Sequence, residues 1–145
     1  MNYWDTSCVL KLYTAEPDSA QYLALASQAT ESLLSSEVLT AELYYALSQK
    51  ELRGEIKVGA AERLWKQFQN DCAAGRWLLL PVGPDVLTRA AQVAKASYRH
   101  RPAVTLRTLD GIHLASALSA KAKQLVTADG RMKQGAAVAG LPVFQ

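Results

Sequence analysis

Short apolar segments alternate with longer amphipathic segments along this chain, and the alternation predicts the order of its strands and helices. Five short runs are expected to be strands: Asn2–Trp4, Leu33–Ser35, Trp77–Leu80, Leu125–Thr127 and Pro142–Phe144. The third run is continuously apolar, which is typical of a strand covered on both faces. Strands this short and this apolar favour a sheet that is buried between other elements.

Between these runs, apolar residues recur at intervals of three and four, the spacing of one helix face. Helices are expected from Thr6 or Ser7 to Tyr13, from Ser19 to Thr30, Glu37 to Arg53, Lys57 to Ala74, Pro84 to Tyr98, Thr105 or Thr108 to about Lys121, and Asp129 to Ala139. Strands that alternate with helices predict an α/β fold, with a parallel sheet flanked by helices.

Composition fits one globular domain over residues 1–145. Half of the 145 residues are hydrophobic and a fifth are charged, which excludes an intrinsically disordered chain. A chain of this length buries about two thirds of its unfolded surface and needs no disulfides. The net charge of +3, from 16 basic and 13 acidic residues, is too small to indicate nucleic-acid binding by itself.

The cysteines and the N-terminus bear on the cellular compartment. Cys8 and Cys72 show no metal-binding spacing, and Cys8 lies among apolar residues typical of a core. The N-terminus lacks the basic and apolar regions of a signal peptide. No apolar run approaches the roughly 20 residues that span a bilayer. We therefore expect a cytoplasmic protein without a membrane segment.

Four acidic residues stand at positions that matter in an α/β fold. Asp5 directly follows the first expected strand, and Asp129 follows the fourth after one intervening residue. Ligands of open α/β sheets bind beyond the carboxyl ends of the strands. Glu42 is bordered by apolar residues on its helix, and Asp110 opens the almost wholly apolar helical segment 109–118.

Each of these residues also has a purely structural interpretation. Asp5 can cap the following helix, Asp110 can complement a positive helix end, and Asp129 before a glycine suits a turn. Glu42 can be a partly solvated residue at the edge of an apolar stripe. Four carboxylates at one sheet end would, however, repel one another unless a cation held them together. Oxygen ligands without His or Cys favour Mg²⁺ or Mn²⁺, and hence metal-assisted phosphodiester chemistry.

The order of four motifs resembles the PIN domain family. The opening Tyr-Trp-Asp-Thr-Ser, with Lys-Leu-Tyr and Glu-Pro soon after, is similar to the first motif. Ser35–Glu42 resembles the second motif, and Val126–Asp129 resembles the fourth. Leu106–Ala117, Leu-Arg-Thr-Leu-Asp-Gly-Ile-His-Leu-Ala-Ser-Ala, is the most distinctive and resembles the third. The chain most resembles the VapC toxins of bacterial toxin–antitoxin pairs.

This resemblance implies a fold, an activity and partners. The fold would be three layers, α/β/α, around a five-stranded parallel sheet. The activity would be that of a Mg²⁺- or Mn²⁺-dependent endoribonuclease, usually dimeric, held silent by a VapB-type antitoxin. Asp5 and Asp110 would be the principal metal ligands, with Asp129 and Glu42 completing the pocket. Asp129 or Glu42 would bind a second ion or orient the attacking water.

Neighbouring polar residues have candidate roles too. The resemblance implies that Thr6 or Ser7 supports Asp5 or positions a water. Arg99, Arg101 and Arg107 precede the third motif and are either an RNA phosphate clamp or a solvated loop. His113, one turn after Asp110, is expected to pack at the helix–sheet boundary or to bond locally rather than to act as a base. Gly111 departs from the family, where alanine is usual.

Two other functions stay open at this point. A haloacid-dehalogenase-like phosphatase also has an aspartate after its first strand, but it needs a second aspartate where Ser7 stands. A PIN fold can also serve as a non-catalytic RNA-binding or assembly module. The four acidic positions favour the nuclease, whose in-line attack would leave a 5′-phosphate and a 3′-hydroxyl. Setting those four aside leaves 16 basic against nine acidic residues, a basic body of +7 around an acidic pocket.

Overall fold

The computed structural model describes all residues, Met1–Gln145, and contains one parallel sheet in the order β3-β2-β1-β4. The strands are β1 (Tyr3–Trp4), β2 (Leu33–Ser36), β3 (Trp77–Leu80) and β4 (Leu125–Val126). Tyr3 pairs with Leu34 on one side and with Leu125 on the other. The predicted α/β class and parallel sheet are confirmed.

The predicted fifth strand is reduced to a single bridge. Val143 pairs in parallel with Leu125, whose amide donates to the Pro142 carbonyl, and Phe144 donates to the Leu125 carbonyl. Pro142 has no N–H with which to extend the ladder. The sheet therefore has four strands rather than five, with the terminal segment lying along the outer edge of β4.

Seven helices connect and cover these strands, as the periodicity predicts. They are α1 (Thr6–Tyr13), α2 (Ser19–Ser27), α3 (Val38–Leu52), α4 (Ala60–Ala73), α5 (Pro84–Arg99), α6 (Thr108–Ser119) and α7 (Gly130–Val138). Most bounds lie within one or two residues of the prediction, although α2 ends three residues early and α4 starts three residues late. None of the seven combines the length and apolar character that crossing a membrane requires.

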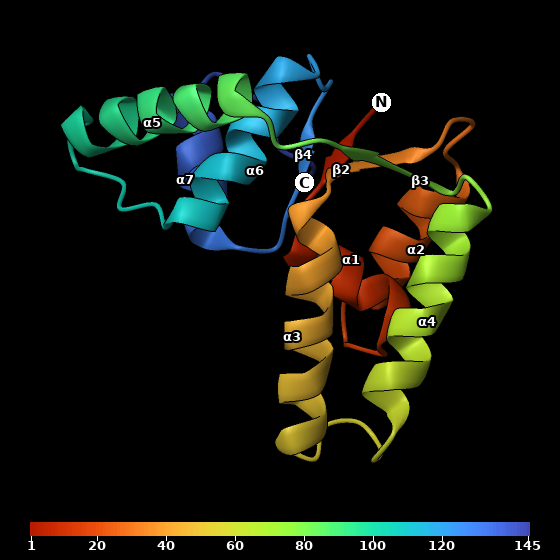
Figure 1. The fold of residues 1–145 in the computed structure, drawn as a ribbon. Coiled ribbons are helices and arrows are strands. Elements are labelled where there is room, and N and C mark those ends of the chain that lie inside the picture. The colour runs from red at the N-terminus through yellow and green to blue at the C-terminus, as the bar shows by residue number, and fades with distance from the viewer.

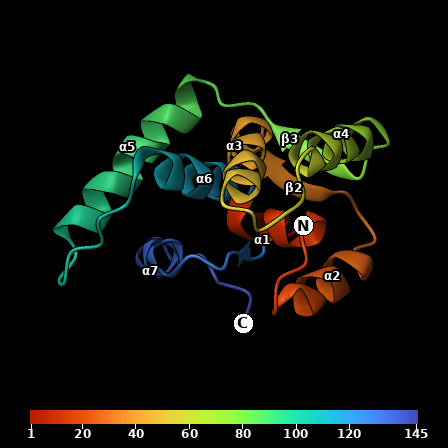
Figure 2. The same cartoon turned by 90° about the horizontal axis from the view of Figure 1, so that it is seen from below.

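Alternate strand residues face two separate cores, which produces three layers. Trp4 and Val126 pack with residues of α1, α2, α3 and α4, whereas Tyr3 and Leu125 pack with residues of α5, α6 and α7. This is the two-residue period of a strand buried on both faces. In Figures 1 and 2, α5, α6 and α7 gather on one side of the molecule, and α2 and α4 lie on the other.

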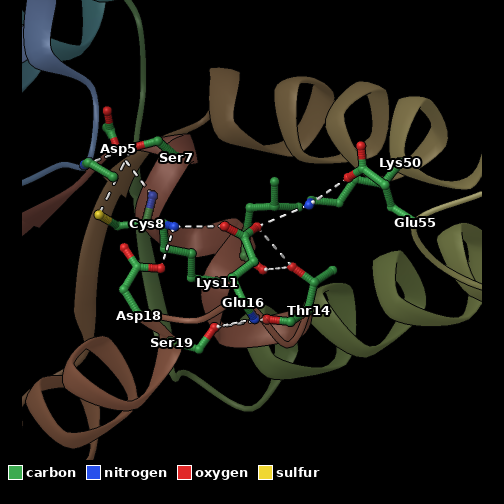
Figure 3. Close-up of polar contacts among 12 residues, drawn as sticks. Asp5, Ser7, Cys8, Lys11, Thr14, Glu16, Asp18, Ser19, Lys50 and Glu55 are labelled. Atoms are coloured by element: carbon green, nitrogen blue, oxygen red, sulfur yellow. Dashed lines mark hydrogen bonds and ion pairs between the residues drawn. The ribbon is translucent and has the colours of Figure 1, made fainter. Parts of the chain in front are cut away.

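Helices α3 and α4 form a long antiparallel pair, which Figure 1 shows extending away from the sheet. A chain of ion pairs joins α3 to the segment between α1 and α2 (Figure 3). Glu16 accepts from Lys11 at 2.7 Å and pairs with Lys50 at 3.1 Å. Lys11 also pairs with Asp18, and Lys50 with Glu55. These contacts fasten the far end of α3 to the body of the protein.

The strand order places a topological switch between β1 and β4. The chain moves outward from β1 through β2 to β3, and then returns to the other side of β1 to form β4. Ligands of α/β sheets bind at the carboxyl ends of the strands at such a point. Asp5 directly follows β1, and Thr127 to Asp129 follow β4, so two of the four predicted site residues lie at this switch.

Candidate functional site

Asp5 is a buried carboxylate, only 5% exposed, at the junction of β1 and α1. Its Oδ1 accepts hydrogen bonds from the Ser7 hydroxyl at 2.6 Å and from the Cys8 amide at 3.2 Å. Its Oδ2 accepts from the Thr127 hydroxyl at 2.6 Å. Burial raises the pKa of Asp5 above its usual 3.8, and the hydrogen bonds from Ser7 and Thr127 only partly offset this. A nearby cation would therefore stabilise the ionised form.

Ser7 is the one of the two residues, Thr6 and Ser7, that supports Asp5, and it also connects Asp5 to the segment that follows β4. Its hydroxyl accepts from the Ala128 amide at 2.9 Å while donating to Asp5. Figure 3 shows Asp5, Ser7 and Cys8 together at the start of α1. A serine here leaves no second carboxylate two positions after Asp5, which argues against the phosphatase alternative.

Asp110 and Asp129 lie on either side of one guanidinium. Arg107 pairs through Nε with Asp110 at 3.2 Å and through Nη2 with Asp129 at 3.8 Å. Asp110 is 7% exposed, and its Oδ2 also accepts from the Arg107 amide at 2.9 Å. Asp129 accepts from the amides of Arg131 and Met132 through Oδ1. Its Oδ2 is the oxygen that faces Arg107.

Three of the four carboxylates thus sit at helix N-termini. Asp5 caps α1, Asp110 lies in the first turn of α6, and Asp129 caps α7. The capping interpretation and the site interpretation are therefore compatible, because each residue offers two oxygens. The N-terminus of a helix carries a partial positive charge, which lowers the cost of placing several carboxylates in one region.

Glu42 projects from the second turn of α3 into a polar contact set. The Thr6 hydroxyl donates to its Oε2 at 2.7 Å, and His113 Nε2 hydrogen-bonds to the same oxygen. Burial acts to raise the pKa of Glu42, but the pKa is held below the usual 4.5 by His113, through its hydrogen bond and its charge, and by the Thr6 hydrogen bond and the nearby Arg107 charge. Thr6 therefore supports Glu42 rather than Asp5, and Glu42 is ionised at neutral pH.

The donor set fits a hard divalent ion, although the present arrangement does not enclose one. No group of three or more acidic, His or Cys side chains lies close enough together to hold a metal. Arg107 instead supplies the positive charge between Asp110 and Asp129. Carboxylate oxygens are the ligands that Mg²⁺ and Mn²⁺ prefer, and Asp5 uses three of about four acceptor positions.

The three candidate phosphate-binding arginines differ in their contacts. Arg107 contacts the carboxylates, whereas Arg101 is exposed and donates to the backbone carbonyls of Tyr98, Arg99 and His100. Neither Arg99 nor Arg101 forms an ion pair or hydrogen bond with any of the four acidic residues. A role for these two in substrate binding stays a prediction.

Three contributors to the site are absent from the sequence-based set. Thr127 donates to Asp5 and accepts from the Asp129 amide at 3.1 Å, joining two of the carboxylates. His113 contacts Glu42, and Tyr3 contacts His113. The position of Thr127 within the fourth motif was a usable signal. The contacts of His113 join residues 110 and 71 positions apart, which no local spacing reveals.

Comparison with known proteins gives one family. Residues 3–138 match the PIN domain model. No curated protein matches the chain.

Solved structures share the fold at low identity. FitAcB from Neisseria gonorrhoeae aligns with a TM-score of 0.72 at 19% identity, over 100% of this chain and 97% of that one. VapBC2 from Rickettsia felis, bound to a promoter DNA fragment, aligns with a TM-score of 0.66 at 17% identity. The alignment covers 99% of this chain and 98% of that one. VapC20 from Mycobacterium tuberculosis, a toxin that cleaves the sarcin–ricin loop, aligns with a TM-score of 0.67 at 13% identity. The alignment covers 92% of this chain and 93% of that one.

Proposed function

The chain belongs to the PIN domain family, and from that premise we propose that it is a metal-dependent endoribonuclease, the toxin of a VapBC-type toxin–antitoxin pair. The observation that supports this proposal is a set of contacts: Arg107 links Asp110 to Asp129, and Thr6, the neighbour of Asp5, bonds to Glu42. Asp5 and Asp129 themselves lie just after the carboxyl ends of β1 and β4, at the switch. That placement is where α/β folds bind ligands. A purely capping set of acidic residues would have no reason to include Glu42, which lies within α3.

The metal ligands we propose are Asp5, Asp110 and Asp129. Bound Mg²⁺ or Mn²⁺ would supply an activated water and offset the charge that develops on the scissile phosphate. Ser7 and Thr127 hold the Asp5 carboxylate in place. Glu42, ionised and fixed by Thr6, accepts a hydrogen bond from the attacking water and orients it.

Arg107 is the residue we assign to the substrate phosphate. Its side chain is 64% exposed and already lies beside two of the carboxylates. A guanidinium can bind a phosphate bidentately, so Arg107 can leave Asp110 and Asp129 for the RNA backbone when a metal takes its place. In-line attack without participation of the ribose 2′-hydroxyl would leave a 5′-phosphate and a 3′-hydroxyl.

The partners and compartment are also part of this proposal. FitAcB and VapBC2, whose chains share the fold, are toxin–antitoxin complexes by name, which supports a VapB-like antitoxin for this chain. We propose a homodimer in the cytoplasm, where RNA is available and where the free thiols of Cys8 and Cys72 stay reduced. A gene for a small protein directly beside this one, whose product co-purifies with it, is the expected partner.

RNA cleavage by active-site variants tests the proposed function. Asp5→Asn and Asp110→Asn should each lose at least 100-fold in rate, because each removes a carboxylate that holds the metal. Asp85→Asn is the matched control, since Asp85 is also in the first turn of a helix, α5, but has no hydrogen bond or ion pair with a site residue. Full activity of either site variant, or equal loss in the control, would contradict the proposal. A PIN fold used only for binding would show no metal-dependent turnover in the wild type.

A further inference from the structure

A buried histidine connects the core of the protein to Glu42. His113 is 3% exposed and lies on α6, one turn after Asp110. Its Nδ1 hydrogen-bonds to the Tyr3 hydroxyl at 2.8 Å, and its Nε2 hydrogen-bonds to Glu42. Tyr3 is fully buried in β1. The three side chains, from β1, α6 and α3, form one continuous chain of hydrogen bonds, the Tyr3–His113–Glu42 relay.

The hydrogen-bonding capacity of the outer two groups determines which nitrogen of His113 carries the proton. An ionised carboxylate only accepts, so Nε2 must donate to Glu42. Burial raises the pKa of Tyr3 to about 12, so its hydroxyl is protonated and needs an acceptor. Nδ1 of a neutral His113 provides that acceptor. Of the two neutral tautomers, only the Nε2–H form lets Nε2 donate to Glu42 while Nδ1 accepts from Tyr3.

The relay also leaves one oxygen of Glu42 free. Thr6 and His113 both bond to Oε2, and Oε1 has no hydrogen-bond or ion-pair partner. Two donors on one oxygen fix the plane of the carboxylate and leave the other oxygen for the chemistry. Orientation of a reacting group by a second set of buried hydrogen bonds is the way that outer residues tune catalytic sites.

We propose that His113 is a positioning residue, held in its Nε2–H tautomer by Tyr3, that orients the Glu42 carboxylate so that Oε1 faces the attacking water. This inference rests on the proposed function, because it gives Glu42 a part in hydrolysis. His113 is not the general base, because both of its nitrogens are engaged in the relay. Its effect on the reaction passes through Glu42.

Nitrogen NMR of the histidine side chains tests the relay independently of any activity. The chain has two histidines, His100 and His113, so long-range ¹H–¹⁵N spectra contain two ring systems, assigned by His100→Gln. We expect a pyridine-type Nδ1 and a pyrrole-type Nε2 for His113 near neutral pH. In Tyr3→Phe, the Nδ1 resonance should shift, because that nitrogen loses its hydrogen bond from the Tyr3 hydroxyl. An imidazolium or an Nδ1–H tautomer in the wild type, or no change in Tyr3→Phe, would overturn the relay.

Kinetics of the holoenzyme test its consequence. His113→Leu and Tyr3→Phe should lower kcat for RNA cleavage by about 10- to 100-fold with little change in KM. His113→Gln keeps a donor near the Nε2 position and should recover part of that loss. His100→Gln is the matched control, because His100 is exposed and bonds locally to the Pro102 carbonyl.

The two arms separate the inference from the function on which it rests. Wild-type activity in His113→Leu would overturn the relay while leaving the nuclease intact. A wild type that cleaves no RNA would overturn the proposed function, and the tautomer of His113 would still decide whether the relay exists. Equal losses in His113→Leu and His113→Gln, with equal melting temperatures, would also count against a donor role.

Discussion

Arg107 pairs with two of the carboxylates that we propose as metal ligands. Its guanidinium contacts Asp110 and Asp129, yet its side chain is 64% exposed. Exposed ion pairs contribute about 0.2–1 kcal/mol, so the competition with a metal is modest. The arginine therefore stabilises the metal-free site without blocking it.

Removal of this side chain should strengthen metal binding. Arg107→Ala is expected to raise the affinity for Mn²⁺ by about two- to fivefold, which corresponds to the loss of one exposed ion pair. Arg101→Ala is the control, because Arg101 bonds only to nearby carbonyls. Calorimetric titration measures both. Weaker Mn²⁺ binding in Arg107→Ala would show that the arginine supports the metal site rather than competing with it.

Burial of Asp5 gives a second prediction, about stability. Its raised pKa means that the folded protein favours the protonated form, so this contribution to stability is present below pH 3.8 and is lost as pH rises through the folded-state pKa. Asp5→Asn should therefore be more stable than the wild type at pH 7 without metal. We expect a melting temperature about 2–4 °C higher, about 1 kcal/mol at this chain length.

The asparagine fits this position. Its carbonyl can accept from Ser7 and Cys8, and its amide can donate to the Thr127 hydroxyl. The difference in stability between variant and wild type should shrink as the pH is lowered toward 3.8, as thermal denaturation across pH would measure. A less stable variant at pH 7 would contradict this interpretation of Asp5.

At the scale of single residues, the sequence indicated the four acidic residues as site candidates, because three of them follow strand ends or open helices. It did not reveal their partners. Ser7 next to Asp5 could be anticipated, since the two are close in the chain. The contact between His113 and Tyr3 depends on α6 packing against β1, and Arg107 lying between two carboxylates depends on where α7 starts.

Two glycines inside helices differ in how much space surrounds them. A Cβ added at Gly111 in α6 would meet the Ala90 carbonyl oxygen at 3.7 Å, an ordinary contact. A Cβ at Gly135 in α7 would meet methyl groups of Leu106 and Leu114, both at 2.9 Å. Both leucines are buried in the core beneath α6 and α7. A side chain at position 135 would thus have to displace buried leucine methyl groups, whereas one at position 111 would not.

Alanine substitutions at these two glycines should therefore change the stability of the protein in opposite directions. Gly111→Ala is expected to stabilise the protein by about 0.4–1 kcal/mol, because it reduces the entropy of the unfolded chain. Gly135→Ala should destabilise it, since overpacking costs about 1–3 kcal/mol and exceeds that gain. Denaturant unfolding measures both. Equal effects of the two substitutions would contradict the packing described for α7.

Helices and strands could be predicted where apolar residues recurred along one helix face or formed one continuous run. The amphipathic pattern of α3 and α4 gave both helices, and the continuous apolar run gave β3. The last strand failed because Pro142 cannot donate to a ladder, so only Val143 forms a bridge. Thr127 was expected within the fourth strand. It instead follows β4, and its side chain bonds to Asp5.

At the scale of the whole molecule, Glu16 links α1 and α3, two helices that are far apart in the sequence. Its carboxylate bonds to Lys11 of α1 and to Lys50 near the end of α3, and all three side chains are at most 21% exposed. Burial would raise the pKa of Glu16, but the hydrogen bonds from the two lysines lower it below its usual 4.5. This contribution to stability is therefore present above pH 4.5 and is lost as the pH falls through the folded-state pKa.

Neutralisation of Glu16 should loosen the attachment of the α3–α4 pair. Glu16→Gln is expected to cost about 1–2 kcal/mol at pH 7, between the values for exposed and buried ion pairs, with a smaller difference from the wild type below pH 4. Glu62→Gln is the control, because the Glu62–Lys66 pair is at least half exposed. Chemical denaturation at two pH values tests this. A loss of stability in Glu62→Gln as large as that in Glu16→Gln would contradict this role of Glu16.

The charge distribution of the whole molecule suits a nuclease better than the net charge of +3 suggests. Without the four site carboxylates, the chain has 16 basic and nine acidic residues. Such a basic body would attract RNA, and the acidic pocket would need a cation before a phosphate could approach. Metal dependence is therefore central to the account.

Cleavage of RNA by the wild-type protein after metal removal tests this claim most directly. We expect EDTA to abolish cleavage, and an excess of Mg²⁺ or Mn²⁺ to restore it, with 5′-phosphate and 3′-hydroxyl ends on the products. Cleavage that persists undiminished in EDTA, or a protein that cleaves no RNA with either ion, would contradict the account.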